Sequence, residues 1–590
     1  MNLNPARPGS RQRAIRVTIL AILVAFGARL VYIQAVQAEA LAAEGVVSRT
    51  VHYDEPARRG DILSSDGTIL ATDVPRYSIE ANQREVEKFV KKDDLTNVEY
   101  VGAEGAARLL APILGVDETT LRGDLTGTSR YVPLVPDASP SLWRKVSELG
   151  VRGIFGVLYY ERSYPAGSVA GNVIGYPYMD GDDGDHPSHY TGLELTQNDL
   201  LTGKPGQRDV EVGGGGEAIP GGEFTGTPAV SGCDVVMTLD SDLQWEALNA
   251  IDQQVAEVGA ESGLVVAIDI PTGEILALAD SGTVNPNEAR RRGLGGSHAV
   301  QDIFEPGSTG KVVTMAMVLE TGEATPTSTY SVPALATFGG QEFKDHDDHA
   351  TANWTLNGIL AQSSNIGTIM AAQNIPDQTR YDYLTKFGFG AATGVELPAE
   401  NPGIVHVPGT QWWDGRTRNT VLFGQGVAVN GLQAAGVYQI VGNGGVAMSP
   451  HLIRSWRCPD GTSGTTPVGQ GTRVISEETA DQLVAMLESA VDDGTGGTAK
   501  ITGYRVAGKT GTSEMIGRDG TADYYVSSFI GVAPADNPRV AVAVIVNDAK
   551  GVSWGATVAA PVFKKVASFA LQRLDVPPST AEPTKIPTTW

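Results

Sequence analysis

Three short motifs hold residue types that could carry out serine acyl transfer. They are Ser308-Thr309-Gly310-Lys311, Ser363-Ser364-Asn365 and Lys509-Thr510-Gly511, and each occurs once in the chain. Since Ser308 and Lys311 are separated by one helical turn, their side chains point the same way from a helix, and the lysine amine can reach the serine hydroxyl. The first motif therefore predicts a serine nucleophile beside a lysine base.

The residues around Ser308 predict how this nucleophile is activated. A serine hydroxyl needs a neighbouring base at neutral pH, and a lysine serves only where burial or nearby positive charge lowers its pKa. Lys509 is a candidate source of that charge. Pro306-Gly307 and the apolar residues 312–319 predict the start and body of a buried helix. Ser308 is thus expected at a helix N-terminus, where backbone N–H groups and the helix dipole favour a developing oxyanion.

Each motif alone has a simpler interpretation. A lone Ser-x-x-Lys is mostly a helix cap, a lone Ser-Ser-Asn is a polar helix end, and a lone Lys-Thr-Gly marks a turn. A phosphate-binding P-loop at Gly310-Lys311 is excluded, because Glu305 stands where that pattern needs glycine and Val312 where it needs serine or threonine. The three motifs in this order favour acyl transfer.

The motifs and their flanking residues resemble those of the penicillin-binding proteins and serine β-lactamases. The flanks are similar in particular to class B penicillin-binding proteins, which are monofunctional peptidoglycan transpeptidases, and the resemblance covers nearly the whole chain. The segments that carry it are Arg59–Ile62, Asp66-Gly67, Tyr164–Gly167, Gly192–Glu194, Thr238–Asp240, Gln244, Thr272–Ala277, Glu305–Ser308, Phe423–Gly426 and Asn443–Gly445.

The resemblance implies catalytic roles for Ser308, Lys311, Ser363 and Lys509, and a substrate-binding role for Asn365. Ser308 attacks the penultimate D-alanine carbonyl of a stem peptide, and Lys311 takes its proton. Ser363 relays a proton to the leaving D-alanine, and the side-chain amide of Asn365 holds the substrate backbone. A covalent acyl-enzyme at Ser308, which β-lactams also form, is the implied intermediate.

The third motif is expected on an edge strand that pairs with the peptide, because Gly511 leaves room for a substrate to approach the backbone. By resemblance, Thr510 and Thr512 bind the terminal carboxylate, and Lys509 supplies positive potential. The backbone N–H groups of Thr512 and Ser308 form the oxyanion hole.

The N-terminal segment predicts a membrane anchor. Residues 1–16 carry several arginines and no acid, and they precede an apolar stretch, 17–36, that is interrupted by Arg29. About 20 residues at helical rise span the hydrocarbon core, and the positive flank places residues 1–16 in the cytoplasm and the rest of the chain outside. A cleaved signal peptide is the alternative, since Ala38-Glu39-Ala40 resembles a cleavage site.

Composition fits a large extracytoplasmic protein. The 590 residues carry a formal charge of −24, which argues against nucleic-acid binding. A fold with only two cysteines, Cys233 and Cys458, is not built on disulfides. Whether these two form a bridge stays open, because distance cannot be judged from sequence.

The pattern of elements predicts an α/β (α+β) transpeptidase domain, residues 232–571, with an antiparallel sheet flanked by helices. Residues 37–231 resemble the elongated pedestal, or dimerisation, domain of class B enzymes. A glycine-rich loop at residues 213–222 precedes the second domain. The proline-containing tail, residues 572–590, is expected to be disordered.

Two loops imitate metal sites. Lys344–His349 lies where some elongation-type relatives bind zinc, but those relatives also use a nearby cysteine that is missing here, so a solvated loop is expected. Asp180–Asp185 imitates a calcium loop but departs from the EF-hand pattern at Gly184 and Asp185. Neither a metal nor a cofactor is therefore expected.

Together these features predict a single-pass membrane D,D-transpeptidase that cross-links D-Ala-D-Ala stem peptides, with a septal role in cell division favoured by resemblance. The alternatives within enzymes are an elongation-type transpeptidase and a D,D-carboxypeptidase. The non-catalytic alternatives are a β-lactam sensor and a divisome scaffold. The implied partner is a polytopic glycan polymerase of the shape, elongation, division and sporulation family, with Arg29 hypothesised at the helix contact.

Overall fold

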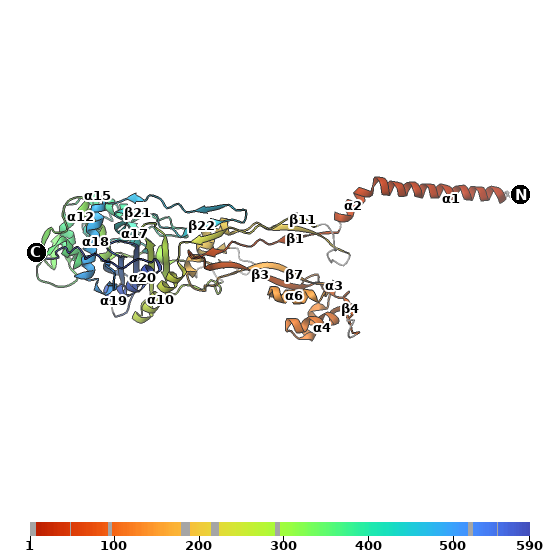
Figure 1. The fold of residues 1–590 in the computed structure, drawn as a ribbon, viewed down its shortest axis with the longest axis horizontal. Coiled ribbons are helices and arrows are strands. Elements are labelled where there is room, and N and C mark those ends of the chain that lie inside the picture. Colours follow the sequence, from red (N-terminus) through yellow and green to blue (C-terminus); the bar gives the residue numbers. More distant parts are fainter. Residues whose placement is uncertain are drawn as a thin grey trace. The chain divides into compact units, whose positions relative to one another are not determined.

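The computed structural model describes residues 8–47, 49–92, 97–178, 189–213, 224–289, 296–516, 523–551 and 553–590 (Figure 1). The calcium-like loop and most of the glycine-rich loop lie outside these residues. The chain forms two compact units. The first contains residues 1–57, 75–160 and 204–230, and the second contains residues 58–74, 161–203 and 231–590.

The first unit begins with the predicted apolar helix. Helix α1 (Pro8–Val31) continues through a π-helical turn (Tyr32–Val36), and α2 (Ala38–Val47) follows. Residues 9–36 have a mean hydropathy of 2.1, and none of the most apolar window is buried within the chain. Such a helix is long and apolar enough to cross a membrane, and it includes the predicted stretch 17–36.

The rest of the first unit includes two groups of paired strands. In one, β10 (Gly206–Glu211) pairs antiparallel with β1 (Thr50–Glu55) on one side and β11 (Phe224–Thr227) on the other. In the other, β3 (Ile69–Ala81) pairs with β6 (Val132–Ala138) and β7 (Ile154–Ser163). Four helices accompany this second group around a small apolar core: α3 (Gln83–Val86), α4 (Gly102–Leu114), α5 (Glu118–Leu125) and α6 (Pro140–Glu148).

A five-stranded antiparallel sheet forms the centre of the second unit, as the sequence predicts. Its order is β14-β13-β27-β26-β25. The central strands are apolar on both faces because each face is covered. The strands are β13 (Ser262–Asp269), β14 (Ile275–Asp280), β25 (Ala507–Ile516), β26 (Asp523–Ala533) and β27 (Val540–Asn547).

Helices cover both faces of this sheet, and the alternation of side chains along β13 divides the core into two. Val265 and Ala267 pack with α10 (Ser241–Val258) and α20 (Ala560–Arg573). Leu264 and Val266 belong to the larger core on the opposite face. The helices of that core include α12 (Lys311–Glu320), α14 (Asn365–Ala372), α17 (Gly431–Gly442) and α18 (Glu477–Asp492).

Smaller elements complete the second unit. The helices are α7 (Gly171–Ile174), α8 (Gly192–Thr196), α9 (Asn198–Leu201), α11 (His298–Gln301), α13 (Leu356–Ala361), α15 (Asp377–Lys386), α16 (Thr417–Thr420) and α19 (Gly555–Val558). The strands include β2 (Ile62–Leu63), β12 (Asp234–Met237), β15 (Thr329–Val332), β16 (Leu335–Phe338), β17 (Gln341–Lys344), β18 (Ala352–Thr355) and β22 (Ile453–Arg457).

Cys233 and Cys458 form a disulfide, which the sequence left open. Strands β12 and β22 are antiparallel neighbours, with Asp234 opposite Arg457. Each cysteine is the next residue beyond this pair, and the two Cα atoms are 4.0 Å apart. The pairing of the strands therefore brings together two cysteines that are 225 residues apart in the sequence.

The C-terminal tail is ordered in the structure, in contrast to the disorder predicted from its prolines. Residues 586–590 lie against β18 and the start of α13. Thr355 donates its backbone N–H to the Thr588 carbonyl at 3.1 Å and its hydroxyl to the Pro587 carbonyl at 2.6 Å. The indole of Trp590 donates to the Tyr330 carbonyl at 3.3 Å. These tertiary hydrogen bonds order the tail, although its local sequence does not favour an ordered structure.

Candidate active site

Ser308 and Lys311 lie together at the start of α12. A 3₁₀ turn (Gly307–Gly310) contains Ser308 and leads directly into the helix, whose first eight residues are buried. Lys311 Nζ donates to Ser308 Oγ at 3.1 Å. The structure thus places the first motif at a helix N-terminus with its amine on the hydroxyl, as its spacing predicts.

Burial sets the protonation of the Lys311 amine. The side chain is 0 % exposed, and this burial lowers its pKa to about 7, although the charge of Asp345 opposes the shift. Burial, and then repulsion from Lys311, also holds the pKa of Lys509 well below its usual range. Lys311 is therefore deprotonated in a large fraction of molecules at neutral pH. The main cause is burial, which the sequence offered as one of two causes beside the charge of Lys509.

Ser363 approaches the same amine from the loop between α13 and α14. Lys311 Nζ donates to the Ser363 backbone carbonyl and lies 3.3 Å from Ser363 Oγ. The backbone of Ser363 has a φ of +63°, which is unusual for a residue with a side chain and costs about 1–3 kcal/mol. The lysine amine thus bridges the two serine hydroxyls.

The loop after β17 is exposed at His346, Asp347 and Asp348, as the sequence predicts, but its buried Asp345 anchors the second motif. Asp345 is only 6 % exposed. Its carboxylate accepts from Ser364 Oγ at 2.6 Å and from the Ile366 backbone N–H at 2.9 Å. Asn365 Nδ2 donates to the Lys344 carbonyl at 3.2 Å. An acidic loop that resembles a metal site in sequence therefore fixes the start of α14.

The third motif lies on β25, which is an edge strand of the sheet, as predicted. A Cβ atom at Gly511 would lie 2.3 Å from Ser528 Oγ and 3.0 Å from the Pro306 carbonyl oxygen. Glycine is therefore needed for the close approach of the neighbouring strand and of the turn that carries Ser308. Substrate access, the reason given for Gly511 from the sequence, is therefore not the only reason for a glycine at this position.

The hydroxyls of the third motif already have partners. Thr510 Oγ1 and Thr495 Oγ1 are 2.7 Å apart, and Lys509 Nζ donates to Thr510 Oγ1 at 3.3 Å. Thr512 Oγ1 makes a longer contact, 3.4 Å, to the Ser553 carbonyl. Thr495 lies in a glycine-rich turn after α18 and is not among the site residues predicted from the sequence.

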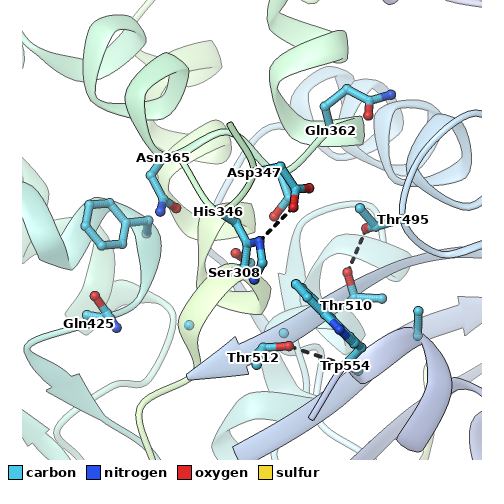
Figure 2. Close-up of a pocket in the computed structure, with 16 residues that line it drawn as sticks. Ser308, His346, Asp347, Gln362, Asn365, Gln425, Thr495, Thr510, Thr512 and Trp554 are labelled. Carbon is cyan, nitrogen blue, oxygen red and sulfur yellow. Dashed lines mark hydrogen bonds and ion pairs between the residues drawn. The ribbon is translucent and has the colours of Figure 1, made fainter. Parts of the chain in front are cut away.

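These elements enclose a cleft of about 150 Å³ (Figure 2). It contains all the predicted site residues except the two buried lysines, Lys311 and Lys509. The lining residues are Gly307, Ser308, His346, Asp347, Gln362, Ser363, Asn365, Phe423, Gln425, Thr495, Thr510, Gly511, Thr512, Trp554, Gly555 and Ala556.

Several lining residues were missed from the sequence. His346 and Asp347 belong to the loop whose sequence imitates a metal site, and their side chains line the cleft instead. The ring of Trp554 lies 4.0 Å, between centroids, from the ring of His346. Nothing local marks Trp554, because only tertiary structure brings it to the cleft.

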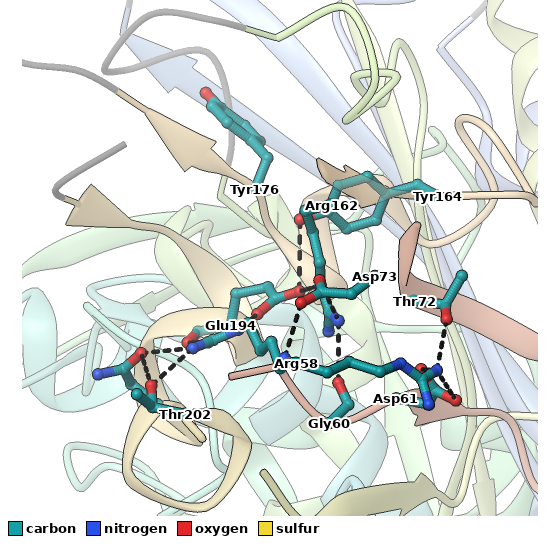
Figure 3. A network of polar contacts seen from close by, with 12 residues as sticks. Arg58, Gly60, Asp61, Thr72, Asp73, Arg162, Tyr164, Tyr176, Glu194 and Thr202 are labelled. Atoms are coloured by element: carbon teal, nitrogen blue, oxygen red, sulfur yellow. Dashed lines mark hydrogen bonds and ion pairs between the residues drawn. The ribbon is translucent and has the colours of Figure 1, made fainter. Parts of the chain in front are cut away.

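A second polar cluster joins the N-terminal segments of the resemblance (Figure 3). The Glu194 carboxylate is 0 % exposed and accepts from Arg59 Nε and Arg162 Nε, each at 2.6 Å. Arg162 also pairs with Asp73 at 3.2 Å, and Tyr164 donates to Glu194 at 3.3 Å. A buried carboxylate between two guanidiniums ties residues 58–74 and 161–203 together, so we assign this cluster a structural role.

Family models match both parts of the chain. The penicillin-binding protein transpeptidase domain matches residues 263–568, and the penicillin-binding protein dimerisation domain matches residues 54–237. Penicillin-binding protein PbpB of Mycolicibacterium smegmatis is 32 % identical over 96 % of this chain and 91 % of that protein. Peptidoglycan D,D-transpeptidase FtsI of Escherichia coli is 30 % identical over 95 % of this chain and 91 % of its own length.

Solved structures agree with these matches. A peptidoglycan synthetase from Bifidobacterium adolescentis is 36 % identical with a TM-score of 0.74, over 92 % of this chain and 100 % of that one. Penicillin-binding protein 3 of Mycobacterium tuberculosis, complexed with aztreonam, is 28 % identical with a TM-score of 0.66, over 90 % of this chain and 98 % of that one. The chain therefore belongs to the class B penicillin-binding proteins, as its motifs predict.

Proposed function

We propose that this protein is a peptidoglycan D,D-transpeptidase that works through a covalent acyl-enzyme at Ser308. The observation that carries the proposal is the 3.1 Å contact between Ser308 Oγ and Lys311 Nζ, whose pKa burial lowers to about 7. A neutral amine at this distance can act as the general base.

Acylation follows from this geometry. As Ser308 Oγ forms a bond to the carbonyl carbon of the penultimate D-alanine, its proton passes to Lys311 Nζ. Ser363 Oγ, 3.3 Å from that nitrogen, relays a proton to the leaving nitrogen, so the peptide bond breaks and D-alanine departs. The backbone N–H groups of Ser308 and Thr512 stabilise the oxyanion. A β-lactam would acylate the same oxygen.

Donor binding is assigned to the residues around this oxygen. The edge strand β25 offers its backbone to an extended peptide, and Asn365 holds the peptide from the opposite wall of the cleft. The hydroxyls of Thr510 and Thr512 bind the terminal carboxylate, and Lys509 Nζ lies 3.3 Å from Thr510 Oγ1. The relatives named above support a stem-peptide donor, and the neighbour solved with aztreonam supports β-lactam inhibition.

The proposed setting is outside the cytoplasmic membrane, with residues 1–16 in the cytoplasm, residues 17–36 across the bilayer, a pedestal at residues 37–231 and the catalytic domain at residues 232–571. The arginine-rich start supports this orientation. The Cys233–Cys458 disulfide also supports it, because disulfides persist in oxidising compartments. A protease added to intact spheroplasts should remove the catalytic domain.

The proposed partner is a polytopic glycan polymerase of the shape, elongation, division and sporulation family, in septal synthesis. A charge inside the apolar helix supports a helix contact, since even low estimates put its insertion cost at about 2.5–3.5 kcal/mol. The Arg29 guanidinium lies 5.6 Å from the Tyr32 ring centroid, a contact that also fits snorkelling to the interface. Arg29→Leu should weaken co-purification with the polymerase, and unaltered co-purification would favour snorkelling.

The test of the main proposal uses the purified full-length protein. A fluorescent penicillin should label it covalently, and paired stem peptides should give a cross-linked dimer with release of D-alanine. Lys311→Ala should lower the acylation rate by several orders of magnitude. Residues that act as one catalytic unit each cause a similar loss of rate when removed, so loss of the base is nearly as severe as loss of the nucleophile. D-alanine release without dimers would indicate a carboxypeptidase, and labelling without turnover would indicate a β-lactam sensor. A protein that shows neither labelling nor turnover would be a scaffold.

A further inference from the structure

The mouth of the cleft has an unbalanced charge. Among the lining residues that the structure describes, Asp347 has the one acidic side chain, and none has a lysine or arginine side chain. Lys311 and Lys509 lie beneath the surface and are 0 % exposed. A reactant that enters the cleft therefore meets the Asp347 carboxylate, whose side chain is 87 % exposed, before it meets a positive group.

The loop that carries this carboxylate is anchored at Asp345. Asp345, two residues earlier, is buried and hydrogen-bonded to the second motif. His346 lies against Trp554, and its Nδ1 is 3.1 Å from Asp347 Oδ1. In the view of Figure 2, this His346–Asp347 contact lies between Asn365 and Thr495. The carboxylate is thus carried on an anchored loop.

The charge of Asp347 suits one of the two reactants in transpeptidation. The donor ends in a carboxylate, which Asp347 repels. The second reactant is an amine that must reach the Ser308 ester after D-alanine has left. An alkyl amine with a pKa of about 10.4 is mostly a cation at neutral pH, and a carboxylate attracts it. A carboxylate on the carbon that bears the amine would cancel this attraction.

We propose that Asp347, held by His346, determines specificity for the acceptor by binding a primary ammonium that has no carboxylate on the same carbon. The inference rests on the proposed transpeptidase function and adds the class of acceptor. Such an ammonium occurs on a lysine-type or ornithine-type side chain of a neighbouring stem peptide, or on a diamino acid whose nearby carboxyl group is amidated.

The covalent step balances with this acceptor. The docked ammonium first loses one proton to solvent. Its nitrogen then forms a bond to the acyl carbon while the bond from that carbon to Ser308 Oγ breaks. The second proton returns to Ser308 Oγ through Lys311. The products are a new amide and the free serine hydroxyl.

The experiment uses the full-length protein and measures how much of its acyl-enzyme reacts with the acceptor amine (aminolysis) and how much reacts with water (hydrolysis). The donor is an N-acylated D-alanyl thioester, and the acceptors are Nα-acetyl-lysine amide and D-alanine. The ratio of aminolysis to hydrolysis is measured at several acceptor concentrations. This ratio is internally normalised, so a change in the amount of active protein does not affect it.

Asp347→Asn should lower the ratio for Nα-acetyl-lysine amide about fivefold, the factor that corresponds to an exposed charge pair of about 1 kcal/mol. The ratio for D-alanine should stay the same or rise. Asp347→Glu should keep most of the lysine preference. Asp348→Asn is the matched control, because it removes the same charge at the next residue, which does not line the cleft, and it should keep the wild-type ratio.

Two results would overturn the inference while leaving the proposed function intact. One is an Asp347→Asn ratio equal to that of wild type. The other is an equal loss in Asp347→Asn and Asp348→Asn, which would indicate a general surface field. If wild type formed no acyl-enzyme and released no product, the proposed function itself would fail.

Discussion

Asp345 Oδ2 accepts a hydrogen bond from Ser364 Oγ at 2.6 Å, which joins an acidic loop to the second catalytic motif. The other oxygen of this carboxylate caps the backbone N–H of Ile366. The same charge also raises the pKa of Lys311 against the effect of burial. One buried carboxylate thus affects both the position of the second motif and the protonation of the general base.

Asp345→Asn should therefore change acylation in two ways. Loss of the charged hydrogen bonds, worth about 1–3 kcal/mol, should slow fluorescent-penicillin labelling roughly ten- to one-hundredfold. Without the negative charge, the pKa of Lys311 should fall further, so the midpoint of the pH profile should move to lower pH. Asp348→Asn serves as the control. A variant with slower labelling and an unmoved midpoint would limit Asp345 to a structural role.

Ser308→Ala should abolish covalent labelling, because it removes the only atom proposed to be acylated. The hydroxyl borders the cleft and is not part of the apolar core, so the thermal unfolding temperature should change by no more than a degree or two. Intact-protein mass spectrometry after penicillin treatment measures the adduct. An adduct of the same mass on the variant would refute the assignment of the nucleophile.

The acylation rate should rise with pH through about 7. The base is the neutral form of Lys311, and burial lowers its pKa from 10.5 to about 7. The neutral fraction is therefore small at pH 5.5, about half at pH 7 and close to complete above pH 8. Stopped-flow acylation across this range gives the profile. A rate that kept rising tenfold per pH unit up to pH 10 would show an unperturbed lysine.

Glu194→Gln should destabilise the second unit strongly. The neutral amide leaves the guanidiniums of Arg59 and Arg162 buried without their shared counter-charge. Breaking a buried ion pair in this way costs about 3–5 kcal/mol. Urea denaturation of the full-length protein measures the loss. A change below about 1 kcal/mol would mean that water or Asp73 compensates the two arginines.

Gly358→Ala should displace the C-terminal tail. A Cβ atom at this position would lie 1.9 Å from the Thr588 carbonyl oxygen, so the tail must move away from α13. A carboxypeptidase, which digests from the C-terminus, should then remove residues 590 to about 586 faster than in the wild-type protein. Gly436→Ala in α17 is the matched control, because its Cβ would have nothing within 4 Å. Equal digestion of the two variants would contradict the docked tail.

Local sequence was sufficient to predict the features that depend on spacing. The three-residue step from Ser308 to Lys311 is a helical turn, so their contact follows once a helix forms there. The apolar stretch at residues 17–36 likewise predicts a helix that is long enough to span a membrane. These predictions depend only on the spacing and polarity of residues that are close together in the sequence.

Tertiary structure alone decided the features that depend on distant neighbours. The pKa of Lys311 is set by burial, which no spacing reveals, and Asp345 is buried because its carboxylate meets Ser364 and Ile366 across the fold. The Cys233–Cys458 bridge follows from the pairing of β12 with β22. The tail is ordered by hydrogen bonds to residues more than 200 positions away. Each such contact stabilises the fold only when two distant segments meet, so the sequence of either segment alone does not reveal it.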